Sequence, residues 1–288
     1  MSSSTDETRS SLRAGRLWIE LHRTLRVPDD GRRYPLPPSF GTFPLHRVRR
    51  GEFITPLRQW EAMWISFDSP YWRPSAVQVE AGGVNALSGE PAGVRLRRGN
   101  YLVSPPQLWL DGVKTAAGAV RQFVAVPLGR GLTVGEQVSG RLDATLRFRV
   151  FPPKPGLFPI RAPRAAKEIY LESGLGIGVG GEIAQEVYAD PHGLRTWDQS
   201  RAAGFTVTLV NSETFTRLTG RRPPPSPISA AEYTRLGLPW FSLYDEPPGT
   251  VDPGDALASL VSAGVQERQE TGTPRVWRIR HPSAAPLP

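Results

Sequence analysis

Alternation of apolar and polar residues is the clearest signal along the chain, and it predicts β-strands. The segment 145–151 alternates strictly, with Leu146, Phe148 and Val150 on one face and two arginines on the other. This pattern is typical of a half-buried antiparallel strand. Related patterns predict further strands that begin near residue 17 or lie at 61–67, 119–126 and 205–210, and residues 100–105 form a short apolar run.

A pair of glycines, Gly82 and Gly83, separates two alternating apolar arms and predicts a β-hairpin over residues 76–88. The densest aromatic run of the chain precedes it, between residues 60 and 72. Large aromatic side chains bring the most buried apolar area per residue, so we expect the core to assemble around them. The residues expected to be buried in mutual contact are Trp64, Phe67, Val77, Val79, Phe123 and Val126.

Helix signals gather in the C-terminal third. The segment 212–219 can be capped by Asn211 or Ser212. A second helix is indicated by the capping box of residues 229–232, and a third by the Asp-Pro pair at 252–253. Elsewhere only a single helical turn is expected, within residues 131–140, so strands outnumber helices.

These patterns predict a β-rich α+β protein with a mainly antiparallel β-sheet or sandwich and two or three short helices in the C-terminal third. The 30 prolines and 29 glycines favour short strands joined by many turns. We expect a disordered tail at 1–12, a single globular unit at 13–248, and a C-terminal helix and tail at 249–288. The Pro-rich stretch 152–165 is either a domain linker or a crossover within one unit.

The formal net charge of +8 raises the question of nucleic-acid binding. Nearly all of the positive charge is arginine, with lysine only at 114, 154 and 167, and the arginines are scattered along the chain. High Arg, Ala, Gly and Pro together are also what a GC-rich genome encodes by codon bias. We therefore interpret the positive charge as a solvated basic surface, and we do not expect nucleic acid to be the partner of this protein.

Composition also bounds the compartment and the chemistry. The chain has no cysteine, which excludes disulfides, thiolate metal sites and a cysteine nucleophile. No apolar segment of a signal peptide opens the sequence, and no stretch approaches 18 consecutive apolar residues. We therefore expect a cytoplasmic protein that does not insert into membranes.

The one named motif is a formal GxGxxG match at residues 176–181. A dinucleotide site would need a buried strand before it and a helix after it. The preceding EIYLES is half charged, and the following EIAQEVYAD alternates passably as a strand, which has no helix-terminal amides to offer. We predict a glycine loop, no cofactor and no metal. A serine-based triad built from distant residues stays open, because triads are recognised by geometry.

Five polar residues interrupt or end apolar runs and are the candidate ligand-binding residues: Asp68, Asp111, Arg121, Gln122 and Asn211. Polar groups at strand ends sometimes bind ligands, but more often they form turns or pair within the structure. For Asp111 and Arg121 the alternative to ligand binding is a structural ion pair that joins two neighbouring strands.

Several segments resemble a family of soluble bacterial proteins to which no activity is assigned. They cover most of residues 25–245 and are 25–45, 64–91, 100–112, 120–140, 182–197 and 210–244. The resemblance implies one family-length unit in place of a fusion. It implies no catalytic residue and no cofactor.

Three classes of function follow. A non-catalytic binding or assembly protein, with a protein partner or a second copy of itself, is favoured because no acid/base, nucleophile or metal constellation stands out. The alternatives are a hydrolase-like enzyme whose site is built from dispersed residues, and a basic protein that binds nucleic acid weakly. A pocket with convergent titratable groups would favour the enzyme. A flat surface of arginines with exposed aromatic side chains would favour the nucleic-acid binder.

Overall fold

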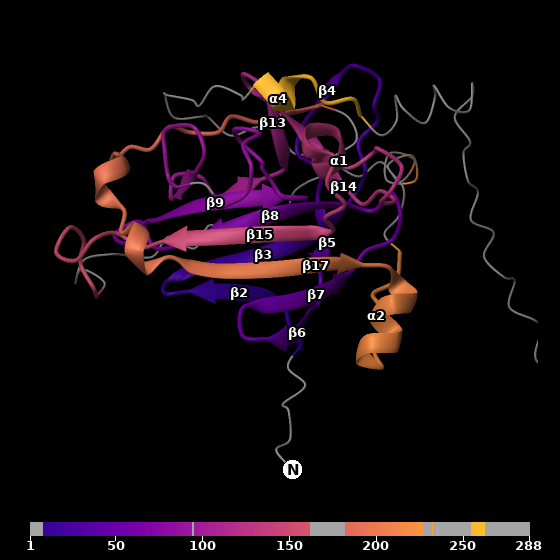
Figure 1. Ribbon diagram of the computed structural model, residues 1–288, viewed down its shortest axis with the longest axis horizontal. Coiled ribbons are helices and arrows are strands. Elements are labelled where there is room, and N and C mark those ends of the chain that lie inside the picture. The colour runs from indigo at the N-terminus through magenta and orange to yellow at the C-terminus, as the bar shows by residue number, and fades with distance from the viewer. Residues whose placement is uncertain are drawn as a thin grey trace, which may run out of the picture.

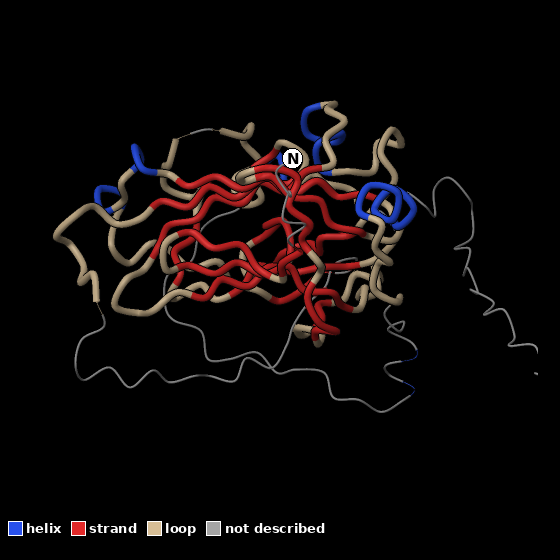
Figure 2. Tube along the Cα trace, turned by 90° about the horizontal axis from the view of Figure 1, so that it is seen from below, coloured by secondary structure: helices blue, strands red, loops and turns tan. Residues whose placement is uncertain are grey.

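Two β-sheets packed face to face form the protein, as the computed structural model shows from two directions (Figure 1, Figure 2). The structure describes residues 8–93, 95–161, 182–226, 232, 235 and 255–262. Within these ranges the protein is β-rich with short helices at its margins, which confirms the predicted β-rich α+β class.

The first sheet has the order β1-β6-β7-β17-β15-β9-β10, with β11 paired to β9. All its pairings are antiparallel except β7 with β17. Its strands are β1 (Thr8–Arg9), β6 (Leu45–Arg49), β7 (Glu52–Pro56), β9 (Ser75–Ala81), β10 (Val84–Asn85), β11 (Leu102–Ser104), β15 (Thr145–Phe151) and β17 (Ala203–Val210).

The second sheet has the order β2-β3-β8-β14-β16-β4, with β5, β12 and β13 paired to β3, β8 and β14. Among the described strands of this sheet, only β4 and β16 pair in parallel. Its strands are β2 (Ser11–Ala14), β3 (Leu17–Thr24), β4 (Arg33–Tyr34), β5 (Ser39–Thr42), β8 (Ala62–Asp68), β12 (Trp109–Leu110), β13 (Gly112–Ala116), β14 (Ala119–Val124) and β16 (Glu182–Ala184).

The described helices are short: α1 (Val134–Ser139), α2 (Ser212–Thr219) and α4 (Asp255–Ala258), with 3-10 turns at Leu194–Thr196 and Gln199–Arg201. α1 begins with a capping box, in which Thr133 and Glu136 satisfy each other's backbone amides. α2 begins at Asn211, whose side-chain oxygen accepts from the Thr214 amide at 2.7 Å. Of the two predicted caps, Asn211 is therefore the one used.

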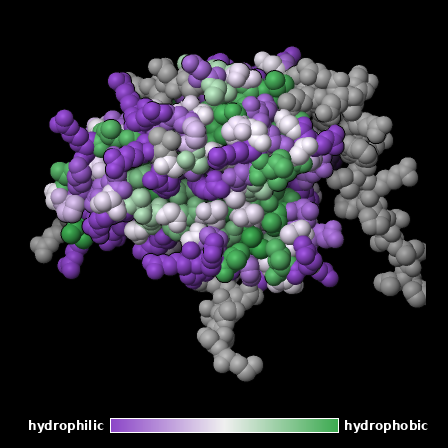
Figure 3. All heavy atoms as spheres, in the orientation of Figure 1, coloured by the Kyte–Doolittle hydropathy of each residue, from purple (hydrophilic) through white to green (hydrophobic). Residues whose placement is uncertain are grey.

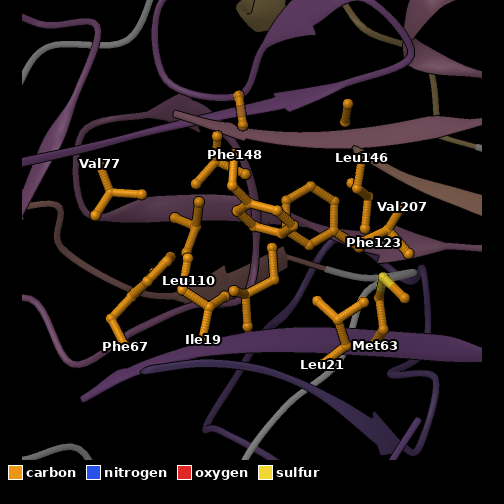
Figure 4. Packing of buried hydrophobic residues seen from close by; sticks show 14 of the residues in the cluster. Ile19, Leu21, Met63, Phe67, Val77, Leu110, Phe123, Leu146, Phe148 and Val207 are labelled. Carbon is orange, nitrogen blue, oxygen red and sulfur yellow. The ribbon is translucent and has the colours of Figure 1, made fainter. Parts of the chain in front are cut away.

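The core lies between the sheets, where the apolar sides of the alternating strands meet (Figure 4). Ile19 and Leu21 of β3 face Val77 of β9 and Phe148 of β15, and all four side chains are fully buried. Burial of apolar surface contributes roughly 25 cal/mol per Å². The strict alternation in the sequence therefore predicts the inner face of these strands correctly.

The expected core is right for Phe67, Val77, Val79 and Phe123, which belong to one buried cluster. For Trp64 the predicted burial is right but the predicted contact is wrong, and for Val126 the predicted burial is wrong. Trp64 is buried on the opposite face of β8, against Leu36 and Trp109, because it alternates with the inward-facing Met63 and Ile65. Val126 lies beyond the end of β14 and is only half-buried.

The predicted disordered tail is wrong for residues 8–12. β1 pairs with β6, and β2 forms a hairpin with β3 around Gly15, whose φ of 62° suits a glycine. Leu12 and Ala14 alternate into the core, with exposed fractions of 1% and 9%. Leu12 and Ala14 are the only apolar residues of β2, and two such residues among polar ones are too weak a pattern to predict a strand.

The hairpin at 76–88 is confirmed, with φ of 60° at Gly82 and 80° at Gly83, as a two-residue turn with two left-handed positions requires. The next described strand after 152–165, β16, pairs with β14 in the second sheet, and the strand after it, β17, pairs with β15 in the first. The glycine run at 174–181 and most of the helix predicted from 229 lie outside the described residues.

Candidate functional site

A cavity of about 600 Å³ lies at one end of the sandwich. Its wall is built from the ends of β9, β14 and β17, the starts of β8 and β15, α1, the first turn of α2, and residues 260–262 after α4. Figure 1 shows these elements on one side of the molecule, and in Figure 3 apolar side chains gather over α1 and the adjacent ends of β15 and β17. Cavities of this size hold ligands of drug-like size.

Most of the cavity wall is apolar because it continues the core. Met63, Phe123 and Leu146 belong to the buried cluster and also line the cavity. β14 pairs with β8 only through Phe123 and Val124, while its first half pairs with β13 and β16. The space at the end of the sandwich is therefore bounded by strand ends, with no further strand to fill it among the described residues.

Arg121 is the notable exception in this wall. It lies two residues before Phe123 on β14 and opposite Val113 of β13, so it shares the inner, apolar face of the strand. Its side chain is half-buried, and its guanidinium has no hydrogen bond or ion pair with any described residue. A cation placed in an apolar wall without a partner is a binding-site signal, since such a charge is normally paired.

Nearby acidic groups are already engaged. Asp143 lines the cavity, and its carboxylate accepts from Arg147 at 2.8 Å and from the Thr145 hydroxyl at 2.6 Å. These hydrogen bonds outweigh the effect of burial and lower the pKa of Asp143, so it is ionised and neutralised by Arg147. Glu182 is the register partner of Arg121, but its carboxylate accepts from Arg33 at 3.2 Å.

Three of the five candidate residues from the sequence line this cavity: Arg121, Gln122 and Asn211. The Gln122 side chain is buried and holds the loop after β3, accepting from the Val27 amide and donating to the Leu25 carbonyl, both at 3.0 Å. Its amide is thus structural. Asn211 uses its oxygen as the α2 cap, which leaves its amide nitrogen at the surface.

The other two candidates lie away from the cavity. Asp68 is exposed at the end of β8 on the outer face of the second sheet. Asp111 is fully buried between β12 and β13, and burial raises the pKa of its carboxyl well above its usual range. A hydrogen bond with the Trp109 side chain lowers this pKa, but the effect of burial is larger. The proposed Asp111–Arg121 pair is therefore wrong, since Arg121 faces the cavity instead.

A backbone irregularity borders the same site. Trp60 has φ of 69°, a left-handed conformation that side chains other than glycine rarely adopt. Its amide donates to the Ala125 carbonyl at 2.7 Å, which joins the loop before β8 to the cavity wall. Strained backbone of this kind tends to gather at functional sites.

Residues 260–262 are held over the cavity by α1. The Gln137 side chain donates to the Val261 carbonyl at 3.1 Å and accepts from the Val261 amide at 2.9 Å. Leu260 is buried in the core, while Val261 is 40% exposed. Nothing in the sequence points to Gln137, because its partner lies far along the chain and has no distinctive residue type.

A second group of polar residues lies on the outer face of the second sheet. His22 Nδ1 is 3.1 Å from Ser39 Oγ, and His22 Nε2 is 3.0 Å from Ser66 Oγ. Burial lowers the pKa of His22 to about 4, so its ring is neutral at pH 7. The sequence left open a serine-based catalytic triad built from distant residues, but it did not identify which residues would form one. The signal was present, since His22 and Ser66 both occupy outward positions of alternating strands.

Within the described ranges, no three His, Asp or Glu side chains gather as a metal-binding group. None of the helices described there has the length and apolar character needed to cross a bilayer. Comparison of the chain with protein-family models, curated proteins and solved structures gave no match. The function must therefore be argued from the geometry of the sites themselves.

Proposed function

We propose that the protein binds one small, mainly apolar molecule in the cavity between β14, α1 and residues 260–262, without transforming it. The observation that carries this proposal is the cavity itself, about 600 Å³ with a predominantly apolar wall that continues the core. A concave apolar pocket with a few polar groups is the usual form of a small-molecule site.

The neutral dye Nile red, whose fluorescence rises in apolar surroundings, tests this proposal. The wild-type protein should bind the dye saturably at one site. Ala125→Trp, on the cavity wall, should weaken binding by at least about tenfold because the indole fills the space. Ala117→Trp is the matched control, since Ala117 is exposed in the turn between β13 and β14. Equal binding by all three proteins, or none by wild type, contradicts the proposal.

A hydrolase is the second candidate, favoured by Ser66 and His22. A neutral histidine within hydrogen-bond distance of a serine hydroxyl can act as its general base. However, the Phe67 amide, which follows Ser66, donates to the Leu108 carbonyl at 2.7 Å. It is therefore engaged in strand pairing and cannot stabilise an oxyanion. Hydrolysis of a p-nitrophenyl ester that Ser66→Ala abolishes would put this candidate first.

We also infer that the protein acts in a reducing, cytoplasmic compartment and belongs to the bacterial family that its sequence resembles. The absence of cysteine and of an 18-residue apolar stretch supports the compartment. Fractionation of cells that express the protein tests it: recovery with the periplasm would contradict the inference.

A further inference from the structure

We propose that the ligand of this cavity is an apolar monocarboxylate, and that Arg121 binds its carboxylate group. This inference rests on the proposed function and specifies the chemical class of the ligand. It follows from three features of the described residues: where Arg121 points, which charges around it are already neutralised, and what the rest of the wall offers.

The orientation of Arg121 follows from the register of β14. Arg121 is the register partner of Val113 and lies two residues before Phe123, and both of these residues pack in the core cluster between the sheets. Residues 121 to 128 all line the cavity. Val120 packs in a separate cluster with Val27 and Ile183 on the opposite face of the strand. The guanidinium therefore extends from the same face as the Phe123 ring, into the cavity.

Among the described residues that line the cavity, Arg121 is the cation whose charge no acidic group balances. Asp143 and Arg147 form an ion pair, and Glu182 pairs with Arg33, whereas Arg121 has neither an ion pair nor a hydrogen bond with a described residue. A half-buried arginine beside apolar surface loses hydration without recovering it from the protein. Hydrogen bonds from the guanidinium to an anionic ligand group would replace the lost hydration, and these bonds would contribute to the affinity for the ligand.

A single arginine beside an apolar wall fits a carboxylate better than a phosphate. The guanidinium fork matches either group through two parallel hydrogen bonds. A carboxylate brings one negative charge, which Arg121 balances. A phosphate monoester brings about 1.5 to 2 charges at pH 7 and would leave the excess in a largely apolar space. The remaining wall, including Met63, Leu146 and Leu209, suits an apolar body.

Displacement of Nile red by three ten-carbon compounds tests the inference: decanoate, 1-decanol and decylamine, each below its aggregation concentration. Their tails are alike and their head groups are anionic, neutral and cationic. Decanoate should bind wild-type protein at least about tenfold more tightly than decanol. Arg121→Gln should abolish this preference, so that the variant binds decanoate no more tightly than decanol; the Nile red affinity of each protein is measured first and used to convert displacement into affinity. Arg98→Gln, at an exposed loop arginine, lowers the net charge equally and should retain the preference.

Each outcome decides a question. Preference for decanoate that depends on Arg121 supports the inference. Equal binding of decanoate and decanol, or stronger binding of decylamine, overturns it but leaves the proposed function standing. Failure of wild type to bind Nile red overturns both. If Arg121→Gln does not fold, Arg121→Lys is the second variant: it retains the charge without the fork, and we expect it to keep part of the preference.

Discussion

His22 and Trp64 stack face to face on the outer surface of the second sheet, with ring centroids 3.9 Å apart and ring planes 19° from parallel. The two residues are register partners on β3 and β8. The stack covers the imidazole, and the side chain of His22 is only 14% exposed. This burial lowers the pKa of His22 from 6.5 to about 4.

The first prediction is a pH dependence of stability. In the unfolded chain His22 binds a proton near pH 6.5, whereas in the folded protein it does so only near pH 4. The unfolded state therefore binds more protons between these values, and stability is lost as pH falls from 6.5 to 4. The loss amounts to about 3 kcal/mol at most.

Urea unfolding of wild type and His22→Gln at several pH values measures this loss. The variant should lose correspondingly less stability between pH 7 and pH 4. His192→Gln is the control, because His192 is exposed, and it should behave like wild type. Parallel curves for wild type and His22→Gln would show that His22 is not buried as a neutral ring.

Asp111 should show the opposite dependence. Its raised folded-state pKa means that the folded protein holds a proton which the unfolded chain releases above about pH 4. Stability should thus fall as pH rises. Asp111→Asn, which keeps the shape and cannot ionise, should be more stable than wild type at pH 7, with an advantage that shrinks toward pH 4. An advantage independent of pH would mean that the carboxyl is ionised in the folded protein.

The packing of α1 against the β9–β10 hairpin gives a third prediction. A Cβ added at Gly135 would lie 2.3 Å from the Gly82 carbonyl oxygen, so α1 can pack here only because residue 135 is a glycine. Gly135→Ala should destabilise the protein by about 1–3 kcal/mol and weaken Nile red binding, since α1 forms one wall of the cavity. Gly204→Ala is the control, because nothing lies within 4 Å of its added Cβ. Equal melting temperatures would contradict this account of α1.

The core gives the fourth prediction. Phe148 is fully buried in the centre of the sandwich, whereas Phe123 borders the cavity and is 8% exposed (Figure 4). Phe148→Ala should cost about 3–5 kcal/mol, and Phe123→Ala less, because it enlarges space that already exists. Chemical denaturation of both variants provides the comparison. A larger loss for Phe123→Ala would show that the cavity is absent in solution.

Local patterns in the sequence were sufficient to predict β3, β8, β14, β15, β17 and the β9–β10 hairpin, and they narrowed the α2 cap to two residues. Strict alternation identifies the inner face of β15, and Gly82-Gly83 supplies two left-handed positions for the turn. The order of strands was not predictable in this way. β7 and β17 pair in parallel although they are far apart in sequence, and no local pattern encodes such a pairing.

The cavity was predictable only in part. Arg121 was identified because it interrupts an apolar strand. Its alternation with Phe123 places it on the inner face, away from the predicted ion pair with Asp111. Met63 and Gln137 could not be identified, since they reach the cavity from β8 and α1 through contacts between distant segments. A site bounded by strand ends depends on sheet topology, which the sequence pattern does not determine.

The most direct test of the cavity as a binding site uses its methionine. The chain has two methionines, Met1 and Met63, and Met63 lines the cavity with its side chain 2% exposed. Protein labelled with ¹³C at the methionine methyl groups should therefore report the ligand in an NMR titration with decanoate. We predict that the Met63 methyl resonance shifts saturably while the Met1 resonance does not move. A Met63 resonance unchanged at saturating decanoate would contradict the account.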